Sequence, residues 1–200
     1  MENKAFKFPK WGIAVGILFL LVIWTVGQYN KLVTLDVHVD NAWADVEVQY
    51  ERRADLVSEL FGIVEGAANF EQSTLIEVTE ARTNWLNTQA DSGASLEAQM
   101  ESANSFDSAL SRLLVTVEAY PTLTATESFQ SFQVEMAGTE NRVAIAREDY
   151  NAAASDYNLA TRKIPMTFFA GIFGFDEAPL FEASEGTESA PEIEFDFSVQ

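Results

Sequence analysis

Apolar residues form one continuous run near the start of the chain and then a helical repeat. Residues 11–30 carry no charge, and the first part of this run, WGIAVGILFLLVIWTV, is almost wholly apolar. A helix of about 20 residues extends about 30 Å, which matches the hydrocarbon core of a bilayer. Helix is also the form in which a single segment satisfies its own backbone hydrogen bonds in lipid. The run therefore predicts a transmembrane anchor over residues 11–30.

Beyond the anchor, apolar residues recur at alternating steps of three and four, the spacing of helices that bury one face. The repeat predicts four helices, over about 31–68, 71–89, 95–119 and 126–163. An Asp-Ser-Gly turn at 91–93 separates the middle two, and Pro121 and Pro165 end the third and fourth. Because such seams pack at shallow angles, the predicted fold class is all-α, a long antiparallel four-helix bundle over 31–164. We expect the anchor and first helix to form one rod, with Gly27 as its obvious hinge.

The four helices differ in length, and this difference predicts an uncovered surface. The first and last would each extend roughly 55 Å, so the shorter middle pair covers only their membrane-distal part. Apolar residues near the membrane would then be exposed in a monomer, and exposed apolar patches usually mark an interface. We expect them either to form a homo-oligomer contact or to be covered by the C-terminal segment. They are Leu32, Leu35, Val39, Ala153, Tyr157 and Ala160.

The flanks of the anchor predict its orientation. Aromatic side chains that favour the membrane interface mark both ends of the run: Trp11, Trp24 and Tyr29. Three lysines precede it, so the positive-inside rule places residues 1–10 in the cytoplasm and the bundle outside. A cleaved signal peptide has the same basic flank, but its apolar core is shorter, about 7 to 15 residues. Gly12 and Gly16 form a GxxxG pair that would let two anchor helices approach closely.

The net charge of the chain limits the classes of molecule that it is expected to bind. The formal net charge is −19, and residues 31–200 hold 30 Asp or Glu against nine Lys or Arg. Such an acidic surface repels nucleic acid and anionic lipid headgroups, and it favours cationic partners, divalent ions or simple solubility. The chain contains no cysteine, so disulfides, thiolate metal sites and cysteine nucleophiles are excluded.

Polar residues at four seam positions predict either a register layer or a binding site. These residues are Gln49, Arg53, Arg82 and Thr139. Buried polar groups fix helix register at some cost in stability, whereas the alternative is a small-ligand or ion site between helices. The one histidine, His38, belongs to no Glu-x-x-His motif of the kind that bundle metal sites use. We therefore predict no metal, no cofactor and no small-molecule substrate.

The C-terminal residues 165–200 predict an aromatic and then acidic tail. The uncharged stretch 165–175 contains four phenylalanines: Phe168, Phe169, Phe173 and Phe175. Since the fourth helix descends towards the membrane, these rings either insert at the interface or fold back to cap the open half of the bundle. Residues 176–200 carry eight acids and no base, with apolar residues between them. This part is expected to be disordered or to lie along the bundle as an extended strip.

Many motifs in one order resemble the LemA family of bacterial membrane proteins, over essentially the whole chain. They are YNKLVTLDVHVDNAWADVEVQYERRADLVSEL from Tyr29, VTEAR from Val78, ALSRLL from Ala109, EAYPTL from Glu118, TENRVAIAREDYN from Thr139, GIFGF from Gly171 and APLFEASEG from Ala178. The resemblance implies an extracytoplasmic or membrane-bound helical bundle and implies no enzyme activity. The chain departs from the pattern near Ser58 and Glu59, where relatives commonly carry Pro-Asn.

These features predict a non-enzymatic, membrane-anchored scaffolding bundle of the inner (cytoplasmic) membrane. Its expected partners are the bilayer, further copies of itself and other envelope proteins, which it would organise or regulate, and nucleic acid is not among them. Serine and carboxylate groups occur without a histidine, lysine or metal-ligand partner at workable spacing, which disfavours catalysis. The alternative is an adaptor for an envelope protease or signalling complex that docks through the acidic tail.

Overall fold

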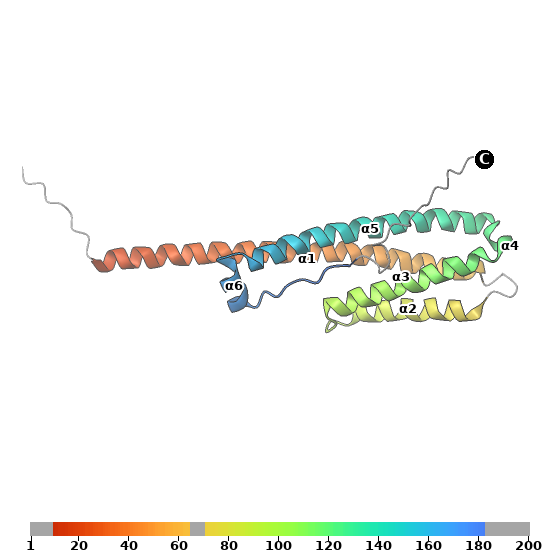
Figure 1. Cartoon of the computed structure of the whole chain (residues 1–200), viewed down its shortest axis with the longest axis horizontal. Coiled ribbons are helices and arrows are strands. Elements are labelled where there is room, and N and C mark those ends of the chain that lie inside the picture. Colours follow the sequence, from red (N-terminus) through yellow and green to blue (C-terminus); the bar gives the residue numbers. More distant parts are fainter. Residues whose placement is uncertain (1–9, 65–70, 183–200) are drawn as a thin grey trace, which may run out of the picture.

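A computed structural model describes residues 10–64 and 71–182 of the protein (Figure 1). Its helices are α1 (Lys10–Val64), α2 (Gln72–Ala90), α3 (Leu96–Glu118), α4 (Pro121–Thr124), α5 (Glu127–Arg162) and α6 (Met166–Phe173). The described residues contain no strand, and the all-α prediction is confirmed. The short helices α4 and α6 lie in segments that the apolar repeat left as a turn and a tail. Of the predicted first helix, residues 65–68 lie outside the described residues, as does the tail beyond residue 182.

Helix α1 is the longest element and joins the anchor to the bundle. Its 55 residues form one unbroken helix, about 80 Å long, through Gly27. It begins with a stretch that is long and apolar enough to cross a membrane, and none of the most apolar window is buried within the protein. Among the described residues it is the one helix with these properties. The apolar start of α1 thus has the length and composition of a single-pass membrane anchor.

The helices pack as two antiparallel pairs of unequal length (Figure 1). Helix α5 runs back along α1, and α2 and α3 form a hairpin that packs on the half of α1 farthest from the anchor. Helix α5 has 36 residues, whereas α2 has 19 and α3 has 23, so the hairpin leaves the near half of α1 and α5 uncovered. Residues 174–182, here called the strap, follow α6 and run along this near half towards the hairpin (Figure 1).

Local sequence signals set where the later helices begin and end. The Ser95 hydroxyl accepts a hydrogen bond from the Ala98 N–H at the start of α3, and Thr126 accepts one from Phe129 at the start of α5. These side chains satisfy donors that a helix leaves unpaired at its first turn. Helix α6 ends at Gly174, whose φ of 75° lies in the left-handed region that glycine adopts without strain.

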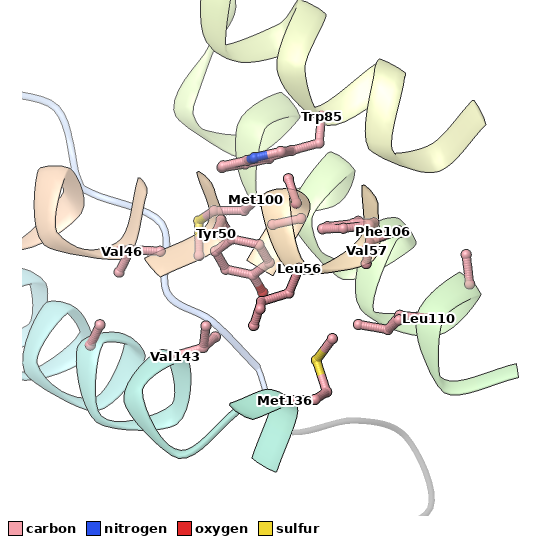
Figure 2. Packing of buried hydrophobic residues seen from close by; sticks show 14 of the residues in the cluster. Val46, Tyr50, Leu56, Val57, Trp85, Met100, Phe106, Leu110, Met136 and Val143 are labelled. Carbon is pink, nitrogen blue, oxygen red and sulfur yellow. The ribbon is translucent and has the colours of Figure 1, made fainter. Parts of the chain in front are cut away.

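One hydrophobic core joins α1, α2, α3, α5 and the strap, and its centre lies around Tyr50 and Trp85 (Figure 2). The Trp85 side chain is 1% exposed, and its ring centroid lies 4.9 Å from that of Tyr50. Around this pair pack Val46, Leu56, Val57, Met100, Phe106, Leu110, Met136 and Val143 (Figure 2). A smaller cluster of Leu32, Ala160, Met166 and Ala170 lies next to the anchor. The core therefore reaches both ends of the bundle.

The substitution Trp85→Ala tests whether this centre holds the hairpin on α1. Removing the ring leaves a large cavity, so we expect the free energy of unfolding to fall by about 3–5 kcal/mol. Urea denaturation of the full chain in detergent, followed by circular dichroism, measures the change. The control is Val115→Ala on α3, at a side chain that is 67% exposed, which should change stability by less than about 0.5 kcal/mol. Equal losses for the two variants would contradict the assignment of Trp85 to the core centre.

Candidate functional site

A polar cluster lies at the meeting point of α1, α3 and α5. Tyr50 and Arg53 come from α1, Asp107 from α3 and Arg147 from α5. The Asp107 carboxylate accepts a hydrogen bond from the Tyr50 hydroxyl at 2.6 Å, one from Arg147 at 2.7 Å and another from Arg53. One carboxylate therefore neutralises part of the charge of two arginines and ties three helices together.

Burial shapes the electrostatics of this cluster. Arg53 is 6% exposed and Tyr50 is fully buried. Burial, followed by the charge of Asp107, raises the pKa of Tyr50 far above its ordinary value, so the phenol stays protonated and donates. Arg147 also donates to Tyr50 and to the Asn104 side chain, the latter at 3.0 Å. The Nε atoms of Arg53 and Arg147 are buried and find no hydrogen-bond partner among the described residues.

The polar cluster lines a groove between α3 and α5. A hollow of about 330 Å³ contacts Arg53 and Arg147 together with Leu110 and Val143. A second hollow of about 360 Å³ shares three lining residues with it: Leu114, Met136 and Glu140. The two therefore form one continuous groove in which apolar residues alternate with charged ones, including the carboxylates of Asp107, Glu118 and Glu140.

The four predicted polar seam residues occupy different settings. Arg53 belongs to the polar cluster, and Arg82 Nε donates to the Ala54 carbonyl at 2.9 Å, which ties α2 to α1. Thr139 is fully buried, donates to Glu135 within its own helix at 3.0 Å and accepts from Arg142. Gln49 is half-buried on α1. The hydrogen bonds of the described residues thus connect Arg53 and Arg82 to neighbouring helices through separate partners.

Three members of the polar cluster were missed by the sequence reasoning. Tyr50 lies one residue beyond the predicted seam residue Gln49, and it is Tyr50 that points into the core. Asp107 and Arg147 directly follow the buried residues Phe106 and Ala146. Charged residues next to a seam are common on solvated helix faces, so their positions alone gave no signal. The pairing of one acid on α3 with arginines on α1 and α5 becomes visible only once the helices are aligned.

The predicted self-association residues are covered within the chain. Each of the following is at most 8% exposed: Leu32, Val39, Ala153, Tyr157 and Ala160. Leu35 is half-buried. The expectation that these residues are exposed is therefore wrong, because α6 and the strap lie over them. The other alternative, covering by the C-terminal segment, is the arrangement that the structure has.

Two asparagines of α5 hold the strap. Asn158 donates to the Ala178 carbonyl at 2.8 Å and accepts from the Ala178 N–H at 2.9 Å. Asn151 makes the same pair of bonds with Phe181, at 3.0 and 2.9 Å. Seven residues separate the two asparagines, so they lie two turns apart on one helix face. Their amides satisfy the strap backbone as a neighbouring β-strand would.

Aromatic rings also hold the strap against α1 and α5. Phe181 stacks on Trp43 at 5.8 Å between centroids and meets the edge of Tyr150 at 5.7 Å. The Tyr150 hydroxyl donates to the Pro179 carbonyl at 2.7 Å, and burial raises the pKa of Tyr150 to about 12. The Arg147 guanidinium lies 4.4 Å from the centre of the Phe181 ring. Arg147 thus connects the strap to the polar cluster.

The anchor residues and the C-terminal aromatics meet at the membrane-proximal end. Trp24 contacts Phe169 edge-on at 5.7 Å between centroids, and Tyr29 contacts Phe173 at 4.9 Å and Phe175 at 5.8 Å. The other predicted anchor residues, Trp11, Gly12 and Gly16, lie in the earlier turns of α1. Trp11 is 72% exposed, and a Cβ added at Gly16 would meet no atom within 4 Å. Phe168 is exposed.

Comparison with known proteins shows which family the chain belongs to. Residues 42–195 match the model of the LemA family. The chain belongs to the LemA family. The match runs from the middle of α1 to beyond the strap, and it therefore contains the polar cluster and both strap asparagines. The resemblance drawn from the sequence motifs is confirmed.

Curated relatives of this LemA family chain include two magnetosome proteins and a LemA protein. Magnetosome protein MamQ 2 and Magnetosome protein MamQ 1 of Paramagnetospirillum magneticum are each 29% identical to the chain over 176 residues, 78% of this chain and 65% of theirs. Protein LemA of Metamycoplasma hominis is 24% identical over 173 residues, 86% of this chain and 76% of its own length. The chain thus spans less than two thirds of the length of the two magnetosome proteins.

The substitution Asp107→Asn tests the role of the polar cluster. The amide leaves two largely buried arginines without a counter-charge, so we expect the free energy of unfolding to fall by about 2–4 kcal/mol. The matched control is Glu77→Gln, which removes the exposed ion pair with Arg112 and should cost less than about 1 kcal/mol. Urea denaturation at pH 7 measures both. A loss for Asp107→Asn no larger than that of the control would contradict the central role of Asp107.

Proposed function

We infer that the chain is a non-enzymatic scaffold of the inner (cytoplasmic) membrane that associates with itself and organises or regulates other envelope proteins. The observation that carries this proposal is the continuity of α1, which runs from the anchor into the centre of the core without a break. A continuous helix transmits position along its length, so the bundle is held at a defined height above the bilayer. A protein that positions others needs such a rigid connection.

The proposed orientation places residues 1–10 in the cytoplasm and the bundle outside, which is the periplasm in a Gram-negative cell. Three lysines precede the anchor, whereas Lys31 is followed by Asp36 and Asp40. This difference in basic residues is the signal that sets the orientation of short membrane flanks.

The buried polar groups support a structural role. Asp107 binds residues of two other helices, and Arg82 binds the backbone of α1, so both contribute to helix pairing. The one histidine, His38, lies exposed on α1. Within 10–64 and 71–182, no group of three His, Cys, Asp or Glu side chains is arranged to hold a metal ion. The proposal therefore assigns the polar cluster to the joining of helices rather than to catalysis.

Self-association is proposed to run through the GxxxG face of the anchor, since the bundle seam is covered within the chain. Gly16→Leu tests it, because the added side chain has free space in the monomer and would obstruct only a neighbouring helix. We expect the full-length parent protein to form a dimer or larger species in detergent, and Gly16→Leu to shift the mass towards the monomer. Multi-angle light scattering measures the masses.

The matched control is Ala14→Leu, which adds the same side chain about 200° around the helix. This variant should keep the parent mass. A monomeric parent protein would contradict self-association, and equal masses for all three proteins would contradict the GxxxG contact.

One observation favours the second function, an adaptor that docks a basic partner. The acidic residues 183–200 lie outside the described residues, but the strap leads to them past a hollow of about 580 Å³ between α3 and residues 179–182. Three acids line this hollow: Glu97, Glu101 and Glu182. Apolar Met100 and Leu180 and one base, Arg112, also line it, so the excess of acids suits a basic segment with an apolar residue.

An oligolysine peptide tests the adaptor proposal by isothermal titration with the full-length protein. We expect binding that weakens as salt rises from low to physiological concentration, and that weakens further in the double variant Glu97→Gln, Glu101→Gln. The control, Glu127→Gln with Glu135→Gln on α5, removes the same charge elsewhere. Equal weakening in both pairs would show attraction to net charge alone and contradict a site at this hollow.

A further inference from the structure

We propose that α6 is a second membrane contact, an interfacial helix that inserts one apolar stripe into the leaflet at the bundle end of the anchor. The proposal rests on the assignment of residues 11–30 as the anchor. It assigns to α6 a lipid partner, and it makes the C-terminal end of α5 a point of attachment to the bilayer.

The depth of α6 follows from its contacts with the anchor. Its Phe169 ring meets Trp24, and Phe173 meets Tyr29. Trp24 and Tyr29 lie about 20 Å and 27 Å along the helix axis from Trp11, in a hydrocarbon core that is about 30 Å thick. Helix α6 is therefore beside the last third of the anchor, at the boundary between acyl chains and headgroups. This placement is independent of which side of the membrane the bundle occupies.

One face of α6 packs on the protein, and the opposite face carries an unpartnered apolar stripe. Met166 and Ala170 are buried beside Leu32 of α1. Phe168 and Ile172 lie four residues apart on α6 with exposed fractions of 65% and 73%, and Ile164, in the turn before α6, is 80% exposed. A four-residue spacing keeps side chains on one helix face, so Phe168 and Ile172 form a single stripe. A stripe of large apolar side chains beside a lipid-spanning segment is the pattern of helices that lie in the interface.

The local charge agrees with a lipid partner, although the chain as a whole is acidic. No acidic residue occurs between Lys163 and Asp176, in a chain with 31 Asp and Glu. Lys163 lies in the turn just before α6, Lys31 lies two residues beyond Tyr29, and both are exposed. Lysines at this depth reach headgroup phosphates while their stems follow apolar surface. The first acidic residues beyond these lysines are Asp36 on α1 and Asp176 in the strap.

Membrane contact through α6 would hold the bundle at two points. A turn of three residues, Lys163, Ile164 and Pro165, joins α5 to α6, so the stripe fixes the end of α5, while the anchor fixes α1. Because α1 and α5 pack along each other, two attachments at the same level restrict the tilt of the pair. The strap begins at the end of α6, so its first residues are held at the same level of the membrane.

Spin labels on single cysteines test the proposal, since the parent chain contains no cysteine. Phe168→Cys and Ile172→Cys carry the label on the stripe in the full-length protein, reconstituted into phosphatidylcholine and phosphatidylglycerol vesicles. The matched control is Val134→Cys on α5, which is 75% exposed and far from the anchor, and Val22→Cys reports the anchor itself. Electron paramagnetic resonance compares the access of oxygen, which concentrates in lipid, with that of a water-soluble nickel chelate.

We expect the labels at 168, 172 and 22 to favour oxygen and the label at 134 to favour the nickel chelate. Labels at 168 and 172 that favour nickel, while the label at 22 favours oxygen, would overturn the α6 proposal and leave the anchor intact. A label at 22 that favours nickel would overturn the anchor as well. The labels at 168 and 172 could instead be shielded from both oxygen and the nickel chelate, with resonance lines broadened by the label of a second protein molecule. This result would show a protein contact and would also overturn the lipid partner.

Discussion

The mismatch in length between the two helix pairs is the constraint on which the rest of the structure depends. Helices α1 and α5 continue towards the membrane beyond the end of the α2–α3 hairpin, and their shared seam stays apolar there. Water contact along that seam would forfeit the burial that holds the pair together. The protein resolves the mismatch with α6 and the strap, which cover Leu32, Val39 and Tyr157 without a second molecule. The C-terminal segment is thus an integral part of the bundle.

Covering a helix pair with an extended segment creates a second problem, because the backbone of the segment needs hydrogen-bond partners. Helices use their own backbone groups internally and cannot supply them. Asn151 and Asn158 meet this need, since one side-chain amide both donates and accepts as a β-strand does. Arg147 then connects the two halves of the molecule, because it contacts Phe181 of the strap and Asp107 of the hairpin. The near half and the far half of the bundle therefore share one charged residue.

The sequence predicted features that arise from periodicity and missed those that arise from pairing. Alternating steps of three and four residues gave the all-α class and the unequal helices, because a buried helix face has to repeat in register with the helix. Tyr50 was missed because it directly follows Gln49 in the sequence. The buried face of a helix is wide enough for either of two adjacent residues to lie on it, so the repeat alone did not select Tyr50. Asp107, Asn151 and Asn158 resemble solvated helix residues in every local respect. Their roles are set by partners 20 to 57 residues away, and such pairs carry no periodic signal.

The extent of the family match follows from the same distinction. A membrane-spanning run is specified by length and apolarity, which many sequences satisfy, whereas the strap and the polar cluster each require particular side chains at particular positions. The match to the LemA family begins at residue 42, after the anchor and within α1, and it extends past the strap. It thus contains the polar cluster, which ties α1, α3 and α5 together, and the asparagine pair with the strap that it holds over the near half of the bundle. One continuous helix joins the anchor to these residues. The anchor, which many apolar sequences could form, therefore sets the position of the bundle, and the polar cluster and the strap set its shape.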